Sequence, residues 1–391
     1  MIAAPATLPT VAGDLYCDET LADSTDLFAR VRAAGPVVWL PRNRLGAIGR
    51  FEDVREALRD DETFRSGKGV AANPLANRLG RHTTLNSDGP VHETRRKILM
   101  RSLGAKALVS VGPSLDAEAE RLIERLLGLR RFDAVADFAS RLPVAVVSRL
   151  VGVRSDHRRM LKWAAATFDA LGPQNRRARR HTPIALSLQA YTRSLTPERV
   201  NAGSWASSVF EARARGEIST PEARALIVDF VAPALDTTIL ASAYLLWMLA
   251  TNPAAWAEIR AEPALIPAAV VEAVRLASPV RVFTRWAAHD CEVGGTRLRR
   301  GSRVAVLFAS GNLDERRFEE PTRFDIHREN NTHLGWGNGP HTCVGIHLAK
   351  LEMQALLRAM VSRVRVIEAG RPERLLNNTL QGIAKLPAAF A

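Results

Sequence analysis

The stretch HLGWGNGPHTCVGIHLAKLE, from His333 to Glu352, holds the residues best suited to chemistry. Its cysteine, Cys343, follows three glycines at alternate positions and precedes an amphipathic helical pattern. A phosphate cradle would need a following Lys-Ser/Thr, or a strand before a GxGxxG turn, and the stretch has neither. A zinc site could recruit His333, His341, Cys343 and His347. Structural zinc sites, however, are usually dominated by paired cysteines.

A single thiolate ligand for haem iron is the interpretation that the pattern favours. The amides at a helix N-terminus and the helix dipole lower the pKa of a cysteine and so help to keep it ionised. The glycines before Cys343 allow backbone N–H groups to approach the sulfur without interference from side chains. Hydrogen bonds to the sulfur tune the potential of the iron. We therefore expect Cys343 to be the metal ligand.

The ten residues WGNGPHTCVG (336–345) resemble the haem-binding signature of the cytochrome P450 family, Phe-Gly-x-Gly-x-His-x-Cys-x-Gly. The one departure is Trp336 in place of phenylalanine, which keeps an aromatic side chain beside the sulfur. The resemblance implies a haem b cofactor, with Cys343 as the iron ligand and Gly345 keeping the next turn slim against the macrocycle. It also implies a soluble bacterial monooxygenase with the mainly α P450 fold and a long central helix over the haem.

Other family motifs occur in the expected order. The segment EAVR places Glu272 and Arg275 three residues apart, on one helical face, and resembles the Glu-x-x-Arg helix of the family. Arg328, in FDIHR, is the candidate for the third member of this structural triad. The resemblance further implies four partners for the haem propionates, two of them on the helix DGPVHETRRKIL: His92, Arg96, Arg285 and His341.

The segment APALDTT matches the family's acid–alcohol pair at Asp236 and Thr237. The resemblance implies that Thr237 holds water near the bound dioxygen, while Asp236 connects this water to solvent. A carboxylate beside a hydroxyl can relay the protons that dioxygen cleavage consumes. A threonine inside a helix can instead bond back to a carbonyl four residues earlier. Proline inside a helix bends the axis, so we expect Pro233 to fix a kink in this helix.

Alignment with the family predicts the residues that face the substrate. They lie in the loop 65–87, on helices and near the C-terminus: Phe168, Leu171, Asp229, Ala232, Val280, Phe283 and Leu380, with Gln381 beside the last. Some segments are similar to bacterial members that hydroxylate or O-demethylate para-substituted aromatic acids and methoxyphenols.

Charge in the pocket bears on the choice between an aromatic acid and a neutral aromatic. Asp229 lies seven residues before Asp236, so both share one helical face. If Asp229 faces the pocket, it repels a carboxylate and favours a neutral methoxyaromatic. Arg81, His82 and Arg281 are the counter-candidates for binding an acid. Two alternatives stay open, namely a different small substrate, such as a terpenoid or secondary metabolite, and a non-catalytic haem protein.

Helical periodicity dominates the rest of the chain. Apolar residues recur at spacings of three and four in 51–60, 115–128, 221–253 and 264–278, and the third of these is long and apolar enough to be a buried central helix. Short strands are expected at 37–40 and 45–50, hairpins within 291–310, and a loop with a short strand in 377–390. With no repeats and no break in composition, residues 1–391 are expected to form one mainly α domain.

Composition limits the partners. The net charge is +13, but the basic residues are mostly arginines spread along the whole chain, and there is no RNA-binding signature. We expect no nucleic acid and no membrane partner, because no run of about 18 apolar residues is present. Three scattered cysteines fit a reducing cytoplasm. A monomer is expected, reduced by a separate ferredoxin or flavoprotein that docks near Arg95, Lys97, Arg101 and Lys350.

Overall fold

A long central helix, α12 (Thr220–Thr251), organises the molecule. The structure is a computed structural model that describes residues 8–391, and 54% of the chain is helical. Pro221 stands in the first turn of α12, and Ser219 and Glu222 form a reciprocal capping box, so the sequence fixes where the helix starts. Seventeen of its residues are buried, as a helix apolar on most sides requires. The mainly α prediction is confirmed.

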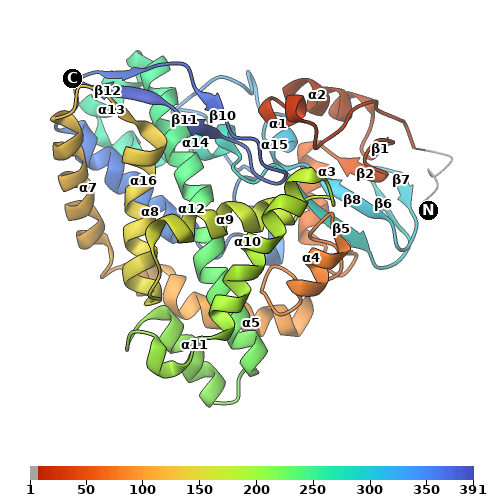
Figure 1. Cartoon of the computed structure of the whole chain (residues 1–391). Helices are drawn as coiled ribbons and strands as arrows, with labels where there is room; N and C mark the ends of the chain where they lie inside the picture. The colour runs from red at the N-terminus through yellow and green to blue at the C-terminus, as the bar shows by residue number, and fades with distance from the viewer. Residues whose placement is uncertain (1–7) are drawn as a thin grey trace.

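The other helices surround α12 (Figure 1). They are α1 (Asp18–Ala22), α2 (Thr25–Ala34), α3 (Phe51–Arg59), α4 (Pro74–Leu79), α5 (Gly89–Leu103), α6 (Ala105–Leu108), α7 (Gly112–Leu127), α8 (Arg141–Val146), α9 (His157–Ala170), α10 (Arg176–Arg193), α11 (Trp205–Ala214), α13 (Pro253–Ala261), α14 (Ile266–Ala277), α15 (Phe308–Gly311) and α16 (Ile346–Val361). Two π-helical turns, Ala134–Ala139 and Val147–Val151, and three 3₁₀ turns, Pro197–Arg199, Pro263–Leu265 and Gly339–His341, complete the helical set.

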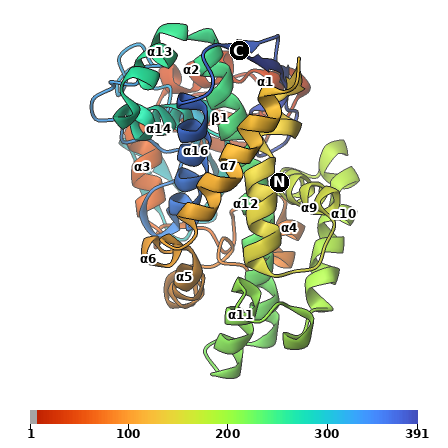
Figure 2. The ribbon, with the colours of Figure 1, turned by 90° about the vertical axis from the view of Figure 1, so that its left-hand side faces the viewer.

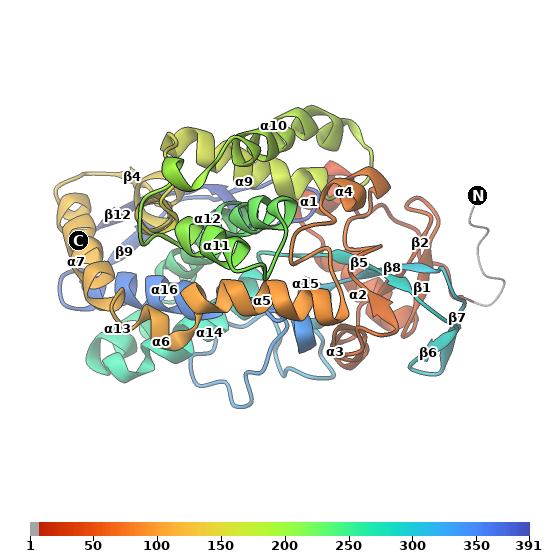
Figure 3. The same ribbon diagram turned by 90° about the horizontal axis from the view of Figure 1, so that it is seen from below.

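Helices α9 and α10 pack against each other and onto α12 on one side, while α7 lies beside α16 on another (Figure 2). Seen from below, α5 crosses the molecule close to α11 and α12 (Figure 3). The largest buried apolar cluster includes residues from α7, α9, α12, α14 and α16. This cluster is the core, and three of the four helical patterns noted in the sequence, 115–128, 221–253 and 264–278, belong to elements that meet here, whereas 51–60 packs in a separate cluster.

The strands form small sheets to one side of the helices and near the C-terminus (Figure 1). They are β1 (Val38–Leu40), β2 (Leu45–Ile48), β3 (Phe64–Arg65), β4 (Phe132–Asp133), β5 (Phe283–Ala287), β6 (Cys291–Val293), β7 (Thr296–Leu298), β8 (Arg303–Val306), β9 (Ile367–Ala369), β10 (Glu373–Arg374), β11 (Ile383–Lys385) and β12 (Pro387–Phe390). The largest sheet has the order β1-β2-β8-β5-β3, in which only β2 and β8 run parallel. The second has the order β4-β12-β9.

Two strand predictions need correction. Within 291–310 only β6 and β7 form a hairpin, across Gly294 and Gly295, which both have positive φ. Strand β8 instead pairs with β2 and β5, because its apolar face is buried in the larger sheet. The C-terminal segment contains two strands, β11 and β12, rather than one. The alternation of apolar and polar residues predicted correctly that these segments are extended, but it did not determine which strands pair with them.

Helix α12 is also the one element of the described residues that is long and apolar enough to cross a membrane, contrary to the expectation that no such stretch exists. In the structure, 61% of its most apolar window is buried inside the protein. Its hydropathy is therefore the hydropathy of a core helix.

Candidate haem-thiolate site

Cys343 lies in a tight loop immediately before α16. Its backbone N–H donates to the carbonyl of Trp336 over 2.7 Å, and the N–H of Gly337 donates to Leu334 over 2.8 Å. Gly337 and Gly339 have φ of +72° and +69°, a region that disfavours other residues. A Cβ on Gly339 would also stand 2.6 Å from the carbonyl oxygen of Leu58 in α3. These glycines therefore shape the loop and allow it to pack against α3.

Burial raises the pKa of the Cys343 thiol above its ordinary value, although a hydrogen bond from the Gly345 N–H and the nearby Arg96 charge act in the opposite direction. The sequence predicted a lowered pKa from the helix N-terminus alone. In the structure the cost of removing a thiolate from water outweighs that effect. A bound metal ion would reverse the balance, because coordination deprotonates a thiol outright.

Four basic residues line the same cavity as Cys343: His92, Arg96, Arg285 and His341. Helix α5 supplies the first two, β5 the third and the cysteine loop the fourth. The His92 and His341 rings lie 4.1 Å apart between centroids, and Nη1 of Arg96 donates to the Thr342 carbonyl over 2.6 Å. The structure therefore brings these four residues together in one cavity, while their role as propionate partners stays a prediction.

This group of residues fits the carboxylates of haem. Burial lowers the pKa of His92 to about 4 and that of Arg285 to about 10, so both sites disfavour their own positive charge and would be stabilised by a nearby anion. Among the described residues, the buried Nε2 atom of His92 and Nε1 atom of Trp336 have no hydrogen-bond partner, and Nε2 of His341 lies 3.9 Å from Oδ1 of Asp88, beyond hydrogen-bond distance. All three nitrogen atoms belong to side chains that line the cavity. The chemistry of the site therefore suits iron protoporphyrin, whereas no cluster of three metal-ligating side chains exists within residues 8–391 to support the zinc alternative.

The predicted structural triad is also present, and it is buried. Nη2 of Arg275 lies 2.7 Å from Oε1 of Glu272, and Nε of Arg328 lies 3.1 Å from the same oxygen. The other carboxylate oxygen of Glu272 accepts a hydrogen bond from Asn331, and Arg275 donates to the carbonyls of Asn312 and Pro321. The triad ties α14 to the segment that precedes the cysteine loop.

Comparison with known proteins agrees with this geometry. A family model described as cytochrome P450 matches residues 204–390. The chain is 32% identical over 390 residues to cytochrome p450 CYP199A2 of Rhodopseudomonas palustris. The aligned region covers 98% of this chain and 94% of the relative. The chain belongs to the cytochrome P450 family.

Two further relatives extend the comparison of this P450. It is 28% identical to linalool 8-monooxygenase of Pseudomonas putida, over 95% of this chain and 96% of the relative. The crystal structure of CYP268A2 of Mycobacterium marinum in complex with pseudoionone superposes with a TM-score of 0.88 at 27% identity, covering 99% of this chain and all of that one. Since P450 enzymes are haem-thiolate proteins, the chain is a haem-dependent oxidoreductase of the monooxygenase class.

The acid–alcohol pair of this P450 is divided between two environments. Thr237 lines the cavity, and its hydroxyl donates to the Pro233 carbonyl over 2.9 Å, the alternative that the sequence left open. Asp236 does not line the cavity. Burial, and then the nearby charge of Asp169, raise the pKa of Asp236 to about 8. Helix α12 runs unbroken through Pro233, and the kink that we expect there stays a prediction.

Asp169 is a residue that the sequence did not single out. It lies at the end of α9, and its Oδ2 atom is 2.6 Å from Nδ1 of His181 in α10. Its Oδ1 atom accepts the Asn378 N–H over 2.8 Å. The side chain of Asp169 is only 3% exposed, whereas that of His181 is 29% exposed. No motif could have predicted this arrangement, because it depends on how two consecutive helices pack and on Asn378, which lies 209 residues further along the chain.

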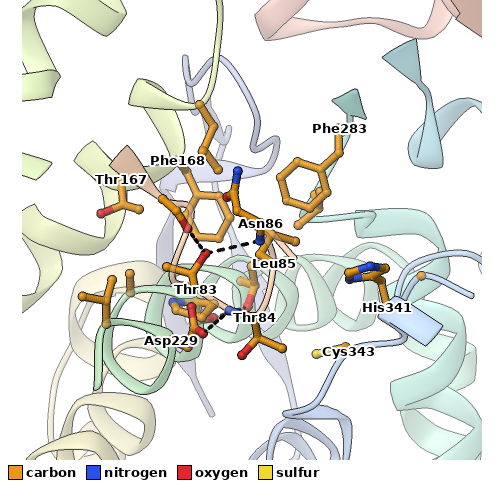
Figure 4. A pocket seen from close by; sticks show the side chains of 18 of the residues that line it. Thr83, Thr84, Leu85, Asn86, Thr167, Phe168, Asp229, Phe283, His341 and Cys343 are labelled. Atoms are coloured by element: carbon orange, nitrogen blue, oxygen red, sulfur yellow. Dashed lines mark hydrogen bonds between the residues drawn. The ribbon is translucent and has the colours of Figure 1, made fainter. Parts of the chain in front are cut away.

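Most predicted substrate-facing residues line the cavity, which Figure 4 shows from close by. Those that do are Phe168, Leu171, Asp229, Ala232, Val280 and Phe283. The loop before α5 contributes Thr83, Thr84, Leu85 and Asn86, as expected. Leu380 does not line the cavity; it is fully buried behind the wall, where it packs with Phe168 and Leu240. Gln381 is likewise absent from the lining, and its amide donates to the Ala277 carbonyl.

The sequence missed the contribution of α10 to this cavity. Thr182, Ala185, Leu186 and Gln189 project into it from that helix. Helix α10 carries no motif, and only its packing against α9 and α12 reveals the role. The arginine-rich start of α10 has an N-cap at Asn175, a signal for the helix but not for the cavity.

Proposed function

We propose that this P450 inserts one oxygen atom from dioxygen into a small aromatic molecule whose reacting end is uncharged, by hydroxylation or by O-demethylation of a methoxy group. The observation that carries the proposal is that Cys343 lines a mostly apolar cavity whose basic lining residues are the four candidates for holding the haem propionates. Bound haem would supply dioxygen activation. The side chains of the protein would bind the haem, exclude water from the site and transfer protons.

In this proposal Cys343 ligates the iron, and His92, Arg96, Arg285 and His341 hold the propionates. The two guanidinium groups would then pair with carboxylates and the two imidazoles would donate hydrogen bonds to them, in a buried site where such pairing is strong. Trp336 shields the sulfur, and Gly345 donates its N–H to it. Glu272, Arg275 and Arg328 position the cysteine loop without contacting the reacting atoms.

Proton delivery is proposed to pass from Asp236 to the Thr237 hydroxyl region. A carboxyl with a pKa near 8 holds its proton at neutral pH and can release it to a stronger base, which suits a general acid. The Thr237 hydroxyl can rotate from the Pro233 carbonyl toward the cavity, since it lines the wall.

The charge of the pocket favours a neutral reacting group. Asp229 faces the cavity, and its Oδ2 accepts the Thr84 N–H over 2.7 Å (Figure 4). Of the three residues considered for binding an acid, Arg281 is fully buried elsewhere and donates to the Leu15 carbonyl, and Arg81 and His82 line a different cavity. A carboxylate close to the sulfur would therefore meet Asp229 without a free arginine.

Reduction followed by binding of carbon monoxide tests the proposed ligand. The wild-type protein should give the long-wavelength Soret band of thiolate ligation, and Cys343→His should lose it while retaining haem. A wild-type complex without that band would overturn the assignment of Cys343.

Substrate titration tests the pocket. The haem spectrum should shift to high spin with para-methoxytoluene and respond far less to para-methoxybenzoate, because Asp229 repels the acid. Formation of para-cresol and formaldehyde with NADH, ferredoxin reductase and ferredoxin would separate an oxygenase from a non-catalytic haem protein. Tight binding of the benzoate would contradict the proposed neutral reacting group.

A terpenoid is the second candidate. One relative is named linalool 8-monooxygenase, and another was crystallised with pseudoionone. Both ligands are uncharged, as Asp229 requires. Linalool in the same titration distinguishes this candidate, since tighter binding than that of para-methoxytoluene would favour it.

A further inference from the structure

A second cavity adjoins the substrate cavity. It lies between the loop after α4, the C-terminal half of α10 and the first turns of α12. Four residues belong to the walls of both cavities: Leu79, Thr83, Gln189 and Val228. A single elongated molecule could therefore extend from one cavity into the other past these shared residues.

The second cavity is basic. Arg81, His82, Arg193 and Arg224 line it, and none of the described lining residues is acidic. Within residues 8–391, none of these four side chains forms an ion pair. The Nε atom of Arg224 is buried and has no hydrogen-bond partner there. A buried guanidinium N–H without an acceptor is costly, so this cavity favours a ligand that brings acceptors and negative charge.

Glu222, two residues before Arg224, forms its ion pair outside this cavity. It accepts from Nη2 of Arg95 over 2.8 Å and from the N–H of Ser219 over 2.9 Å. Its attachment to Arg95 has a second effect, because Nη1 of Arg95 donates to the carbonyls of Arg81 and Thr83. The loop that carries Arg81 and His82 is therefore held in place.

Opposite charges stand at the two sides of the shared wall. Asp229 faces the substrate cavity and accepts the Thr84 N–H, whereas the preceding residue, Val228, lines both cavities. An anion is thus disfavoured near the thiolate and favoured beyond Val228. This arrangement would orient an amphipathic molecule with its uncharged end toward Cys343.

We propose that the second cavity binds the anionic end, a carboxylate or a phosphate monoester, of an elongated substrate whose uncharged end is oxidised. The inference rests on the proposed function and adds the charge and length of the substrate to it. Arg81, Arg193 and Arg224 provide planar donor groups that match either anion bidentately. The three guanidinium groups then determine specificity without contacting the reacting atoms.

Ligand pairs test this proposal on the haem-loaded enzyme. We would titrate para-methoxyphenyl alkanoates of increasing chain length, their primary amides and the corresponding alkyl phosphates, and follow the shift of the Soret band. Once the chain reaches the second cavity, the anion should bind roughly tenfold more tightly than the amide. The advantage should decrease at high salt.

Variants locate the effect. Arg224→Gln and Arg193→Gln should remove most of the anion advantage and leave the affinity of the amides unchanged. Arg130→Gln is the matched control, because it changes an exposed arginine that lines neither cavity. This variant should keep the higher affinity of the anion over the amide. Carbon monoxide spectra of all variants check that the thiolate site is intact.

Three results would overturn the proposal. Equal affinity of acid and amide at every chain length would do so, as would an advantage that persists in Arg224→Gln. Competition by inorganic phosphate without any gain from a tethered anion would show that the cavity takes a free anion only. In each case a high-spin shift with the amides would leave the proposed function standing. Failure of the proposed function would instead appear as loss of the thiolate spectrum or no response to any uncharged ligand.

Discussion

At the scale of single residues, environment changes the chemistry that a residue type suggests. Asp236 is acidic by composition, but burial raises its pKa to about 8, so at neutral pH it holds a proton. Cys343 likewise has a raised pKa, because desolvation of the thiolate outweighs its position at a helix start. The surroundings of both groups therefore shift their pKa values away from those of the free side chains.

Asp236→Asn tests the proposed proton donor. Because the protonated form predominates below its pKa, wild-type turnover should fall as pH rises through about 8. The variant should turn over about 100-fold more slowly and lose this pH limb, with unchanged substrate affinity. Steady-state turnover rates with purified donor proteins, measured from about pH 6 to about pH 9, would test both the loss of rate and the loss of the pH dependence.

The control for that experiment is Glu62→Gln, which alters an exposed carboxyl group. It should leave both rate and pH profile unchanged. If Asp236→Asn retained wild-type turnover and the limb near pH 8, the proton pathway would have to start elsewhere.

Glu352, in α16, gives a second prediction that depends on burial. Its two carboxyl oxygens have no partner among the described residues, and burial raises its pKa from 4.5 to about 8. In the unfolded chain the group loses its proton near pH 4.5, whereas the folded protein keeps it until about pH 8. Stability should therefore fall as pH rises between these values.

Glu352→Gln removes this protonation cost and keeps the shape of the neutral acid. We expect the variant to gain about 1–3 kcal/mol in unfolding free energy at neutral pH and little at acidic pH. Denaturant unfolding of wild type and variant at both pH values measures it. A variant less stable at neutral pH would show that the glutamate is ionised and paired in the fold.

At the scale of elements, the buried triad illustrates how one spacing can have two meanings. Glu118 and Arg121 in α7 are three residues apart, as are Glu272 and Arg275 in α14. The first pair is exposed to solvent, while the second is fully buried. The sequence spacing is identical, and only the packing of α14 against the segment before the cysteine loop distinguishes them.

The two pairs form a matched experiment. Glu272→Gln leaves two buried arginines without their carboxylate and should destabilise the protein by about 3–5 kcal/mol. Glu118→Gln should cost less than about 0.5 kcal/mol. Thermal unfolding of both variants, together with haem content after purification, measures the difference. Equal effects of the two substitutions would contradict a positioning role for the triad.

At the scale of the whole molecule, the positive net charge is expected to affect how fast the electron donor associates with the protein. The structure removes Arg95 from the expected docking residues, because it is buried and paired with Glu222. Arg101 is paired with Glu217. Lys97 is exposed and Lys350 half-buried, and neither forms an ion pair within residues 8–391, so both remain candidates.

Lys97→Gln should slow reduction by an acidic ferredoxin a few-fold at low ionic strength, because opposite charges accelerate encounter. The difference should vanish at high salt, and the affinity for substrate should not change. Stopped-flow reduction in the presence of carbon monoxide measures the rate. Arg130→Gln serves as a control of equal charge, and an equal slowing in that variant would locate docking elsewhere or indicate only a general charge effect.

Sequence alone was sufficient for the family, and it singled out Cys343 and the four basic residues that share its cavity. These depend on short motifs whose residue types and local spacing carry their chemistry. The main helices were predictable for a similar reason, because apolar periodicity and the capping box before α12 are local properties.

Only the tertiary structure determined burial, strand partners and contacts between side chains, because local sequence patterns carry no information about distant segments. In the folded protein Leu380 lies behind the wall of the substrate cavity, and Arg95 and Arg281 are buried. Strand β8 belongs to the larger sheet, and Asp169 pairs with His181. The tertiary structure also separated Asp229 from the basic cavity that Arg81 and Arg224 share. Burial, pKa and the boundary between two cavities depend on segments far apart in the chain, and these meet only when the helices pack.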